Sequence, residues 1–172
     1  MELEKAKAIA EELKSLLEPA CEKMVIAGSI RRQKPEVGDI ELLCIPRYVT
    51  GVDQLDRGVR RLFVRGVLTY HRNKRGSTTY GPKNKLLLHL GSGIGVDMFS
   101  TTEDCWPVAL VVRTGGENTN KEIATRALKR GMRFHAYGRG FTLADGGELI
   151  CRSEAAVFRA VGLAYKQPWE RR

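Results

Sequence analysis

Two carboxylates at alternate positions of an apolar segment constrain the fold of this chain more than any other feature. Asp39 and Glu41 lie within residues 37–45, whose other members are apolar. Residues two apart on a strand point to the same face of a sheet, so the carboxylates share one face while Ile40 and Leu42 point into the core. Neighbouring carboxylates repel each other unless cations lie between them, and divalent ions such as Mg²⁺ prefer oxygen ligands. The segment therefore predicts a strand with one buried face and one metal-binding face.

A third acid, Asp97, lies in the middle of a second apolar segment, residues 94–100. On a similar face of a strand, its carboxylate could lie beside Asp39 and Glu41. Three clustered acids suit a pair of divalent metal ions that hold the attacking and leaving oxygens of an in-line displacement. A single acid on a strand is more commonly a surface charge, but the grouping next to a glycine-serine turn favours a metal site.

That glycine-serine turn follows residues 24–27, an apolar run that predicts a short buried strand. Gly28 lets the backbone approach a ligand closely. Ser29 offers a hydroxyl group and an N–H at the start of a short helix, where anions are favoured. Arg31 and Arg32 add planar donors suited to phosphate oxygens. A turn followed by two solvated arginines is a common alternative, but the short return to the acidic strand favours a triphosphate site.

The basic residues are unevenly distributed along the sequence. The chain has 172 residues and a net charge of +9, and residues 57–96 contain nine basic side chains and no acidic one. This basic block favours a polyanionic partner, although a solvated basic face without a partner is the alternative.

Membrane, export and disulfide signals are weak in this sequence. No stretch approaches the ~20 apolar residues of a membrane span, and the charged N-terminal segment lacks the apolar region of a signal peptide. The four cysteines are widely scattered without a C-x-x-C pair. Such cysteines are typical of buried thiols in a reducing compartment and not of a disulfide framework or a zinc site. These patterns predict a cytoplasmic protein.

Apolar periodicity and turn residues predict an α+β fold. Apolar residues at three- and four-residue steps, with capping and stop signals, predict helices at 2–17, 52–63, 103–112, 118–129 and 153–161. Short apolar runs bounded by turn residues predict strands at 24–27, 37–45, 65–72, 77–80, 85–90 and 94–100, and short strands within 132–150. The pattern changes near residue 101, so we expect two domains, residues 1–100 and 101–172.

The acidic motifs and the glycine-serine turn, in this order and spacing, resemble those of the X-family DNA polymerases within the polymerase-β-like nucleotidyltransferase superfamily. Residues 113–121 (Arg-Thr-Gly-Gly-Glu-Asn-Thr-Asn-Lys) resemble the segment that opens the family's nucleotide-selecting helix. Residues 157–171 are similar to the family's closing pattern, an apolar helix followed by Tyr-x-x-Pro-x-x-Arg. The chain resembles the minimal two-domain form of the family, which lacks the N-terminal lyase domain.

This resemblance implies a nucleotidyltransferase palm, a mixed sheet with helices, followed by a small α+β domain that selects the nucleotide. It implies that Asp39 and Glu41 bind two Mg²⁺ or Mn²⁺ ions, and that Asp97 binds the catalytic metal and assists deprotonation of the primer 3′-hydroxyl. The residues that would bind the incoming nucleotide are Gly28, Ser29, Arg32, Gly38, Gly115 and Asn120. Without a lyase domain, DNA binding would depend on the basic block, in particular on Arg72, Lys74, Arg75, Lys83 and Lys85.

The activity implied is that of a metal-dependent DNA polymerase that adds dNMP to a primer 3′-hydroxyl. Its partners would be dNTP and gapped or primer-template DNA, and we expect a monomer that fills short gaps in DNA repair in a bacterial, phage or viral setting. Two alternatives stay open. One is a template-independent or RNA- or protein-modifying nucleotidyltransferase on the same palm, and the other is a non-catalytic nucleic-acid-binding protein.

The sequence departs from the family pattern at three places. Glu41 is found where these polymerases usually have Asp. Val112 and Arg113 replace an aromatic pair that backs the sugar, which predicts weak discrimination against ribonucleotides. Ala124 aligns with an arginine that often contacts the template, and Arg126 is the candidate substitute.

Overall fold

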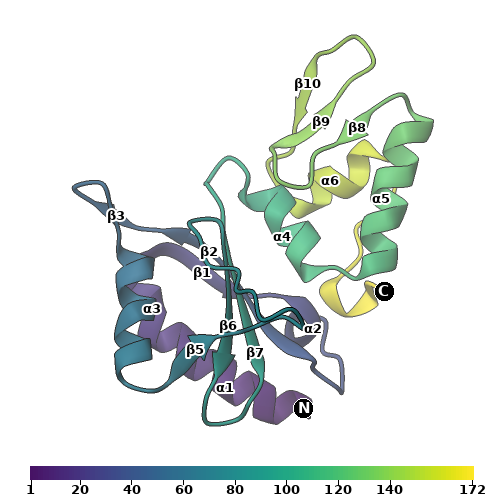
Figure 1. Ribbon diagram of the computed structural model, residues 1–172. Coiled ribbons are helices and arrows are strands. Elements are labelled where there is room, and N and C mark those ends of the chain that lie inside the picture. Colours follow the sequence, from purple (N-terminus) through teal and green to yellow (C-terminus); the bar gives the residue numbers. More distant parts are fainter. The chain divides into compact units, whose positions relative to one another are not determined.

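The computed structural model describes residues 1–172, which divide into two compact units. The first unit contains Met1–Ile30 and Lys34–Thr101, and the second contains Arg31–Gln33 and Thr102–Arg172 (Figure 1). Three residues that follow the glycine-serine turn thus cluster with the C-terminal part of the chain, which the sequence did not indicate. The assignment of the two parts as a palm and a nucleotide-selecting domain stays a prediction.

The first unit is built on a five-stranded mixed sheet. Its strand order is β1 (Cys21–Ile26), β2 (Asp39–Pro46), β7 (Gly95–Ser100), β6 (Asn84–His89) and β5 (Leu68–Tyr70). The β2–β7 pair is parallel and the other pairs are antiparallel. The two acidic segments therefore form adjacent strands, with β7 in the centre of the sheet.

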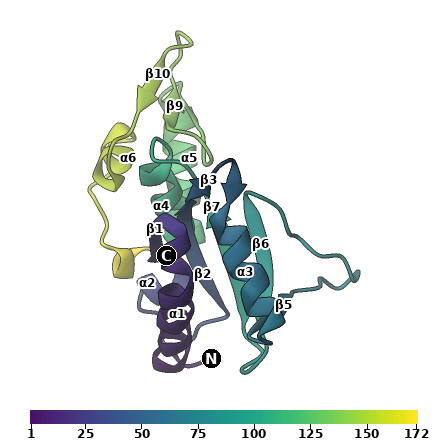
Figure 2. The ribbon, with the colours of Figure 1, turned by 90° about the vertical axis from the view of Figure 1, so that its left-hand side faces the viewer.

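Helices α1 (Leu3–Leu17) and α3 (Gln54–Val64) form the core of the first unit with one face of this sheet. Buried apolar residues of both helices pack in one cluster with Ile40, Leu42 and Met98. The two helices lie alongside the sheet (Figure 2). The 3₁₀ turn η1 (Glu18–Ala20) follows α1, and a small hairpin of β3 (Tyr48–Val49) and β4 (Val52–Asp53) precedes α3. Helix α3 starts two residues later than its apolar spacing predicts, because Asp53 caps it by accepting the N–H of Asp56 at 3.1 Å.

The second unit combines helices with a small antiparallel sheet. Its elements are α4 (Trp106–Thr114), α5 (Glu117–Lys129), β8 (Arg133–Phe134), β9 (Gly140–Thr142), β10 (Glu148–Ile150), α6 (Glu154–Ala160) and η2 (Pro168–Glu170), with sheet order β10-β9-β8. Its buried core includes Val111, Ile123, Phe141 and Phe158. Ser153 caps α6 through the N–H of Ala156, at 3.1 Å. The α+β class, with a mixed sheet followed by a smaller α+β part, is confirmed.

One predicted strand is wrong. Residues 77–80 form only isolated bridges, which pair Arg72 with Thr78 and Tyr80 with Lys85. The side chain of Asn73 accepts the N–H groups of two later residues of the loop, at 2.9 and 3.0 Å. This side-chain turn competes with strand pairing.

None of the helices has the length and apolar character that crossing a membrane requires.

Candidate functional site

The three predicted catalytic acids lie on one face of the first unit's sheet. In the parallel β2–β7 pair, Glu41 is directly opposite Asp97 and Asp39 is opposite Gly95. Residues that pair across strands share a face, and so do residues two apart on one strand, so all three carboxylates lie on the same side. Asp39 is exposed and the other two are half-buried. The intervening Ile40 lies on the opposite, core-forming face.

This arrangement supplies the donors that a divalent metal requires. Carboxylate oxygens are the ligands that Mg²⁺ uses in proteins, usually together with waters and substrate phosphates. As the side chains are placed, no group of three His, Cys, Asp or Glu residues is arranged to hold a metal ion. The metal-binding roles of Asp39, Glu41 and Asp97 therefore stay predictions.

Gly28 lies directly against the carboxylate of Glu41. The residue has φ of +59°, and a Cβ added there would lie 1.9 Å from Glu41 Oε2. The turn is also tied to β2 by the Ala27 N–H, which donates to the Glu41 carbonyl oxygen at 2.8 Å. Gly28 thus leaves the space that the Glu41 side chain uses, which supplies a reason for glycine at this position.

We expect Gly28→Ala to lower the free energy of unfolding by about 1–2 kcal/mol, because a side chain at positive φ is strained and Glu41 must move. Gly38→Ala is the matched control, since a Cβ at Gly38 meets nothing within 4 Å. Denaturant unfolding of both variants measures the difference. Equal losses in the two variants would contradict the close packing of Gly28 on Glu41.

Ser29 lies in the single turn of α2 (Gly28–Arg31). Its Oγ is buried and has no hydrogen-bond partner. The helix is too short for its dipole to be large, so the hydroxyl group is the stronger indication of a polar ligand. Gly38, which directly precedes β2, borders open space. The contacts of Ser29 and Gly38 with a triphosphate stay predictions.

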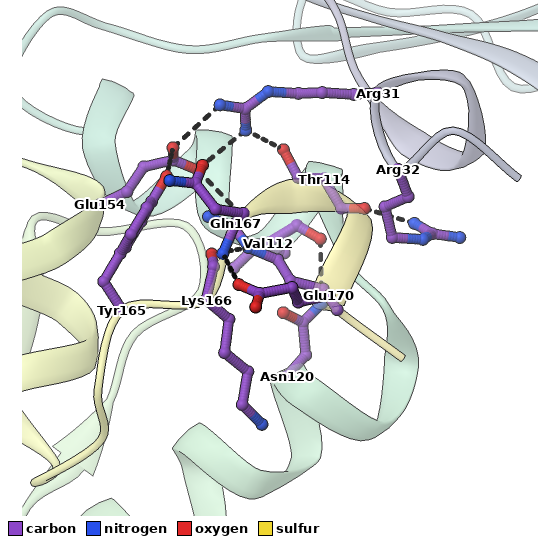
Figure 3. Close-up of polar contacts among 11 residues, drawn as sticks. Arg31, Arg32, Val112, Thr114, Asn120, Glu154, Tyr165, Lys166, Gln167 and Glu170 are labelled. Atoms are coloured by element: carbon purple, nitrogen blue, oxygen red, sulfur yellow. Dashed lines mark hydrogen bonds and ion pairs between the residues drawn. The ribbon is translucent and has the colours of Figure 1, made fainter.

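In the second unit, Arg32 and Asn120 are fixed by backbone carbonyl groups. Arg32 Nη1 donates to the Thr114 carbonyl oxygen, and a Cβ at Gly115 would lie 2.8 Å from the same Nη1. Gly115, with φ of +72°, lets the guanidinium group lie against the backbone. Asn120 Nδ2 donates to the Val112 carbonyl oxygen at 2.9 Å (Figure 3). The structure thus brings three predicted nucleotide-binding residues, Arg32, Gly115 and Asn120, into the second unit.

Four buried side-chain polar atoms have no hydrogen-bond partner. They are Ser29 Oγ, Arg32 Nε, Asn120 Oδ1 and Arg171 Nη2. An unpaired buried polar group costs about 1–3 kcal/mol, so each such atom needs an explanation. Three of the four belong to residues predicted to bind the nucleotide: Ser29 in the first unit, and Arg32 and Asn120 in the second. In each unit, a bound polar group would supply the missing partner.

A largely buried ion-pair network joins Arg31 to the C-terminal segment within the second unit. The guanidinium group of Arg31 binds both carboxylate oxygens of Glu154 at 2.9 Å and also donates to Thr114 Oγ1 (Figure 3). Arg171 Nη1 donates to the same carboxylate at 3.0 Å, and Tyr165 OH donates to it at 3.2 Å. Arg171 is fully buried and lies 5.1 Å from the ring centroid of Phe158. The network anchors residues 31–33 in the second unit.

The sequence does not indicate this network. Its local pattern favours Arg31 as a phosphate donor and places Glu154 in the helix predicted at 153–161. The Tyr-x-x-Pro-x-x-Arg pattern contains Tyr165 and Arg171 and was the available signal. However, Arg31 and Glu154 are 123 positions apart, so no local periodicity relates them.

Burial raises the pKa of Glu154, but hydrogen bonds and charges from Arg31 and Arg171 outweigh it, so the pKa lies below its ordinary value. A lowered pKa in the folded state stabilises the protein above the pKa of the unfolded chain, about 4.3. We therefore expect this contribution to disappear as the pH falls from about 4.3 through the folded-state pKa. Acid unfolding monitored by tryptophan fluorescence tests this, because Trp106 and Trp169 both lie in the second unit. A Glu154→Gln variant should lose this part of the pH dependence, and an unchanged acid transition would contradict the assignment.

Four of the five predicted DNA-binding residues are exposed in or next to the loop between β5 and β6. They are Arg72, Lys74, Arg75 and Lys83. Arg72 Nη1 also donates to the Gly76 carbonyl oxygen at 2.9 Å, which holds the loop closed. Their exposure suits phosphate contacts, and those contacts stay predictions.

The structure contradicts the predicted DNA contact of the fifth residue, Lys85. Only 2% of Lys85 is exposed, and its Nζ donates to the Gly81 carbonyl oxygen at 3.0 Å and lies 3.8 Å from Asp53 Oδ2. It pairs with Met98 of β7 and therefore lies on the core face of the sheet. Tyr80 covers it, with the ring centroid 5.4 Å from Nζ. Lys85 is a structural residue and is not available to DNA.

Comparison with known proteins agrees with this geometry. Residues 109–172 match the DNA polymerase beta thumb family. The fold is similar to that of polymerase beta from Leishmania infantum, crystallised as a ternary P/T complex, with a TM-score of 0.73 and 19% sequence identity. The match covers 100% of this chain and 76% of that chain. No curated protein matches the sequence significantly.

The chain therefore has the polymerase-β fold over its whole length, with a thumb-family segment at residues 109–172. The fold and the thumb-family match both support the resemblance to X-family polymerases noted in the sequence.

Proposed function

We propose that this protein is a metal-dependent DNA polymerase that adds dNMP to a primer 3′-hydroxyl and fills short gaps during DNA repair. The observation that supports it most strongly is the parallel register of β2 and β7. This register places Asp39, Glu41 and Asp97 on one sheet face beside the turn that contains Gly28 and Ser29. The polymerase-β fold and the thumb-family match make DNA the best-supported nucleic acid.

The roles of the residues follow from the charge that develops during phosphoryl transfer. Two Mg²⁺ ions, when bound by the three carboxylates, would neutralise the charge on the reacting oxygens. Asp97 would accept a hydrogen bond from the primer 3′-hydroxyl and assist its deprotonation. The new bond would join the primer O3′ to the α-phosphorus of dNTP, and the bond to the bridging oxygen would break to release pyrophosphate. The unpaired Ser29 Oγ and Arg32 Nε would donate to the triphosphate oxygens.

The second unit would contribute nucleotide selection through Gly115 and Asn120. Asn120 Oδ1 is buried without a partner and is a suitable acceptor for a sugar or base donor. Val112 and Arg113 provide no aromatic ring behind the sugar. The side chain of Arg113 instead lies 5.5 Å from the ring centroid of Tyr137.

Primer extension on gapped DNA, with one dNTP at a time and Mg²⁺ or Mn²⁺, tests this function. We expect incorporation of the complementary dNMP only, and its loss on removal of divalent metal. Incorporation that ignores the template base would instead support a template-independent nucleotidyltransferase. Parallel reactions with rNTPs test sugar selection: comparable incorporation is expected from Val112 and Arg113, and strong rejection would mean that another group guards the sugar.

A further inference from the structure

The outer side of α3 has an exposed row of arginines. Arg57, Arg61 and Arg65 are all exposed and are spaced by four residues. At 1.5 Å of rise per residue, they follow one side of the helix at intervals of about 6 Å. Together with Arg60 and Val64, they form what we call the α3 arginine face.

The charge of the α3 arginine face is largely uncompensated. Asp56 is the only acid within α3, and both of its oxygens are occupied, by Arg60 Nε at 2.7 Å and by Tyr80 OH at 2.7 Å. Arg57, Arg61 and Arg65 form no ion pair. Three positive charges thus remain free on one side of a single helix, and they attract an extended polyanion more strongly than a single small anion.

An exposed apolar side chain, that of Val64, lies among these arginines. Val64 is 91% exposed, which is unusual for a β-branched apolar residue. With Arg60, Arg61 and Arg65 it lines a shallow depression of about 340 Å³. A sugar-phosphate backbone has the matching chemistry, since its sugars are partly apolar and its phosphates bind guanidinium groups.

The α3 arginine face does not share a side with the three acids. The inner side of α3 packs through Leu55, Val59 and Leu62 on the core that contains Ile40 and Met98, whereas the acids lie on the opposite face of the sheet. A DNA phosphate bound on α3 is therefore not one of the phosphates next to the three acids, where the primer 3′-end would react.

We propose that the α3 arginine face is a second DNA contact, which binds the backbone of a DNA segment away from the primer end. The inference rests on the proposed function in taking DNA as the substrate. Binding at this face would increase affinity for DNA without contributing to the chemical step. It would also be independent of base sequence, because phosphates carry no sequence information.

The test compares a triple variant, Arg57→Gln with Arg61→Gln and Arg65→Gln, with a control triple variant, Lys5→Gln with Lys7→Gln and Lys14→Gln. The control removes the same charge from the mixed-charge helix α1. The probe is a fluorescent blunt-ended DNA duplex without a gap, and anisotropy gives Kd between about 50 and 200 mM salt. For the α3 variant we expect the slope of log Kd against log salt to fall by about 2 to 3. Raising the salt over this range should therefore weaken DNA binding by the variant about 30-fold less than DNA binding by the unaltered protein. The control should keep the slope of the unaltered protein.

Gap filling then separates affinity from chemistry. We expect the α3 variant to raise the KM for gapped DNA and to leave kcat unchanged. An unchanged salt slope, or an equal change in the control, would overturn the proposal. An α3 variant that keeps its DNA affinity but loses binding to phosphatidylserine vesicles would also overturn it, because the face would then bind an anionic lipid surface and not DNA. Failure of the proposed function would look different, because the unaltered protein would then transfer no nucleotide whatever the variants bind.

Discussion

Replacing Asp97 by Asn should abolish nucleotide transfer while leaving the fold and DNA binding intact. Asn keeps the shape of the side chain but removes the negative charge that lies opposite Glu41 on β2. A metal-stabilised transition state is worth several kcal/mol. A loss of about 4 kcal/mol lowers the rate about 10³-fold, so single-turnover gap filling with saturating DNA is the appropriate measurement.

Asp104→Asn is the matched control, because Asp104 is an exposed carboxylate outside the acidic face. It should retain the full rate, and anisotropy should show equal DNA affinity for both variants. If Asp97→Asn retained the activity, Asp97 would have no catalytic role. If no metal-dependent activity were present in the unaltered protein, the non-catalytic nucleic-acid-binding alternative would be favoured.

The second large effect concerns stability. Glu154→Ala leaves the guanidinium groups of Arg31 and Arg171 without their shared carboxylate, and Arg171 is fully buried. Removing one partner of a buried ion pair costs about 3–5 kcal/mol, because an uncompensated charge stays buried. We therefore expect the second unit to unfold at markedly lower denaturant concentration, as reported by Trp106 and Trp169.

A surface ion pair in the same unit provides the comparison. Arg139 and Glu148 lie 2.6 Å apart with both side chains about half exposed, and such a pair contributes at most about 1 kcal/mol. Glu148→Ala should shift the transition only slightly. Similar shifts for Glu148→Ala and Glu154→Ala would contradict a buried, stabilising role for Glu154.

Local patterns in the sequence were sufficient to predict most of the elements. The apolar spacing of residues 2–17 predicted α1 within one residue, and period-two alternation correctly placed Asp39 and Glu41 on one side of β2. These predictions succeed because the periods of helices and strands follow directly from backbone geometry. Catalytic roles for the acids, in contrast, stay predictions.

Tertiary contacts account for what the sequence could not show. The burial of Lys85 depends on Tyr80 and Asp53, which lie on other segments of the first unit. The Arg31–Glu154 pair depends on a contact between residues far apart in the chain, and either residue alone is typical of a solvated surface. Side-chain turns such as that of Asn73 override strand propensity for a local reason that composition does not reveal.

The parallel pairing of β2 and β7 also determines which insertions and deletions this protein can accept. A single residue added within either strand would move Asp97 or Glu41 to the core face and expose Met98 or Leu42 in its place. The long connection between the two strands has no such restriction in its exposed turns, such as the one around Lys74 and Arg75. Among relatives, we therefore expect length differences in that connection and none inside the two strands.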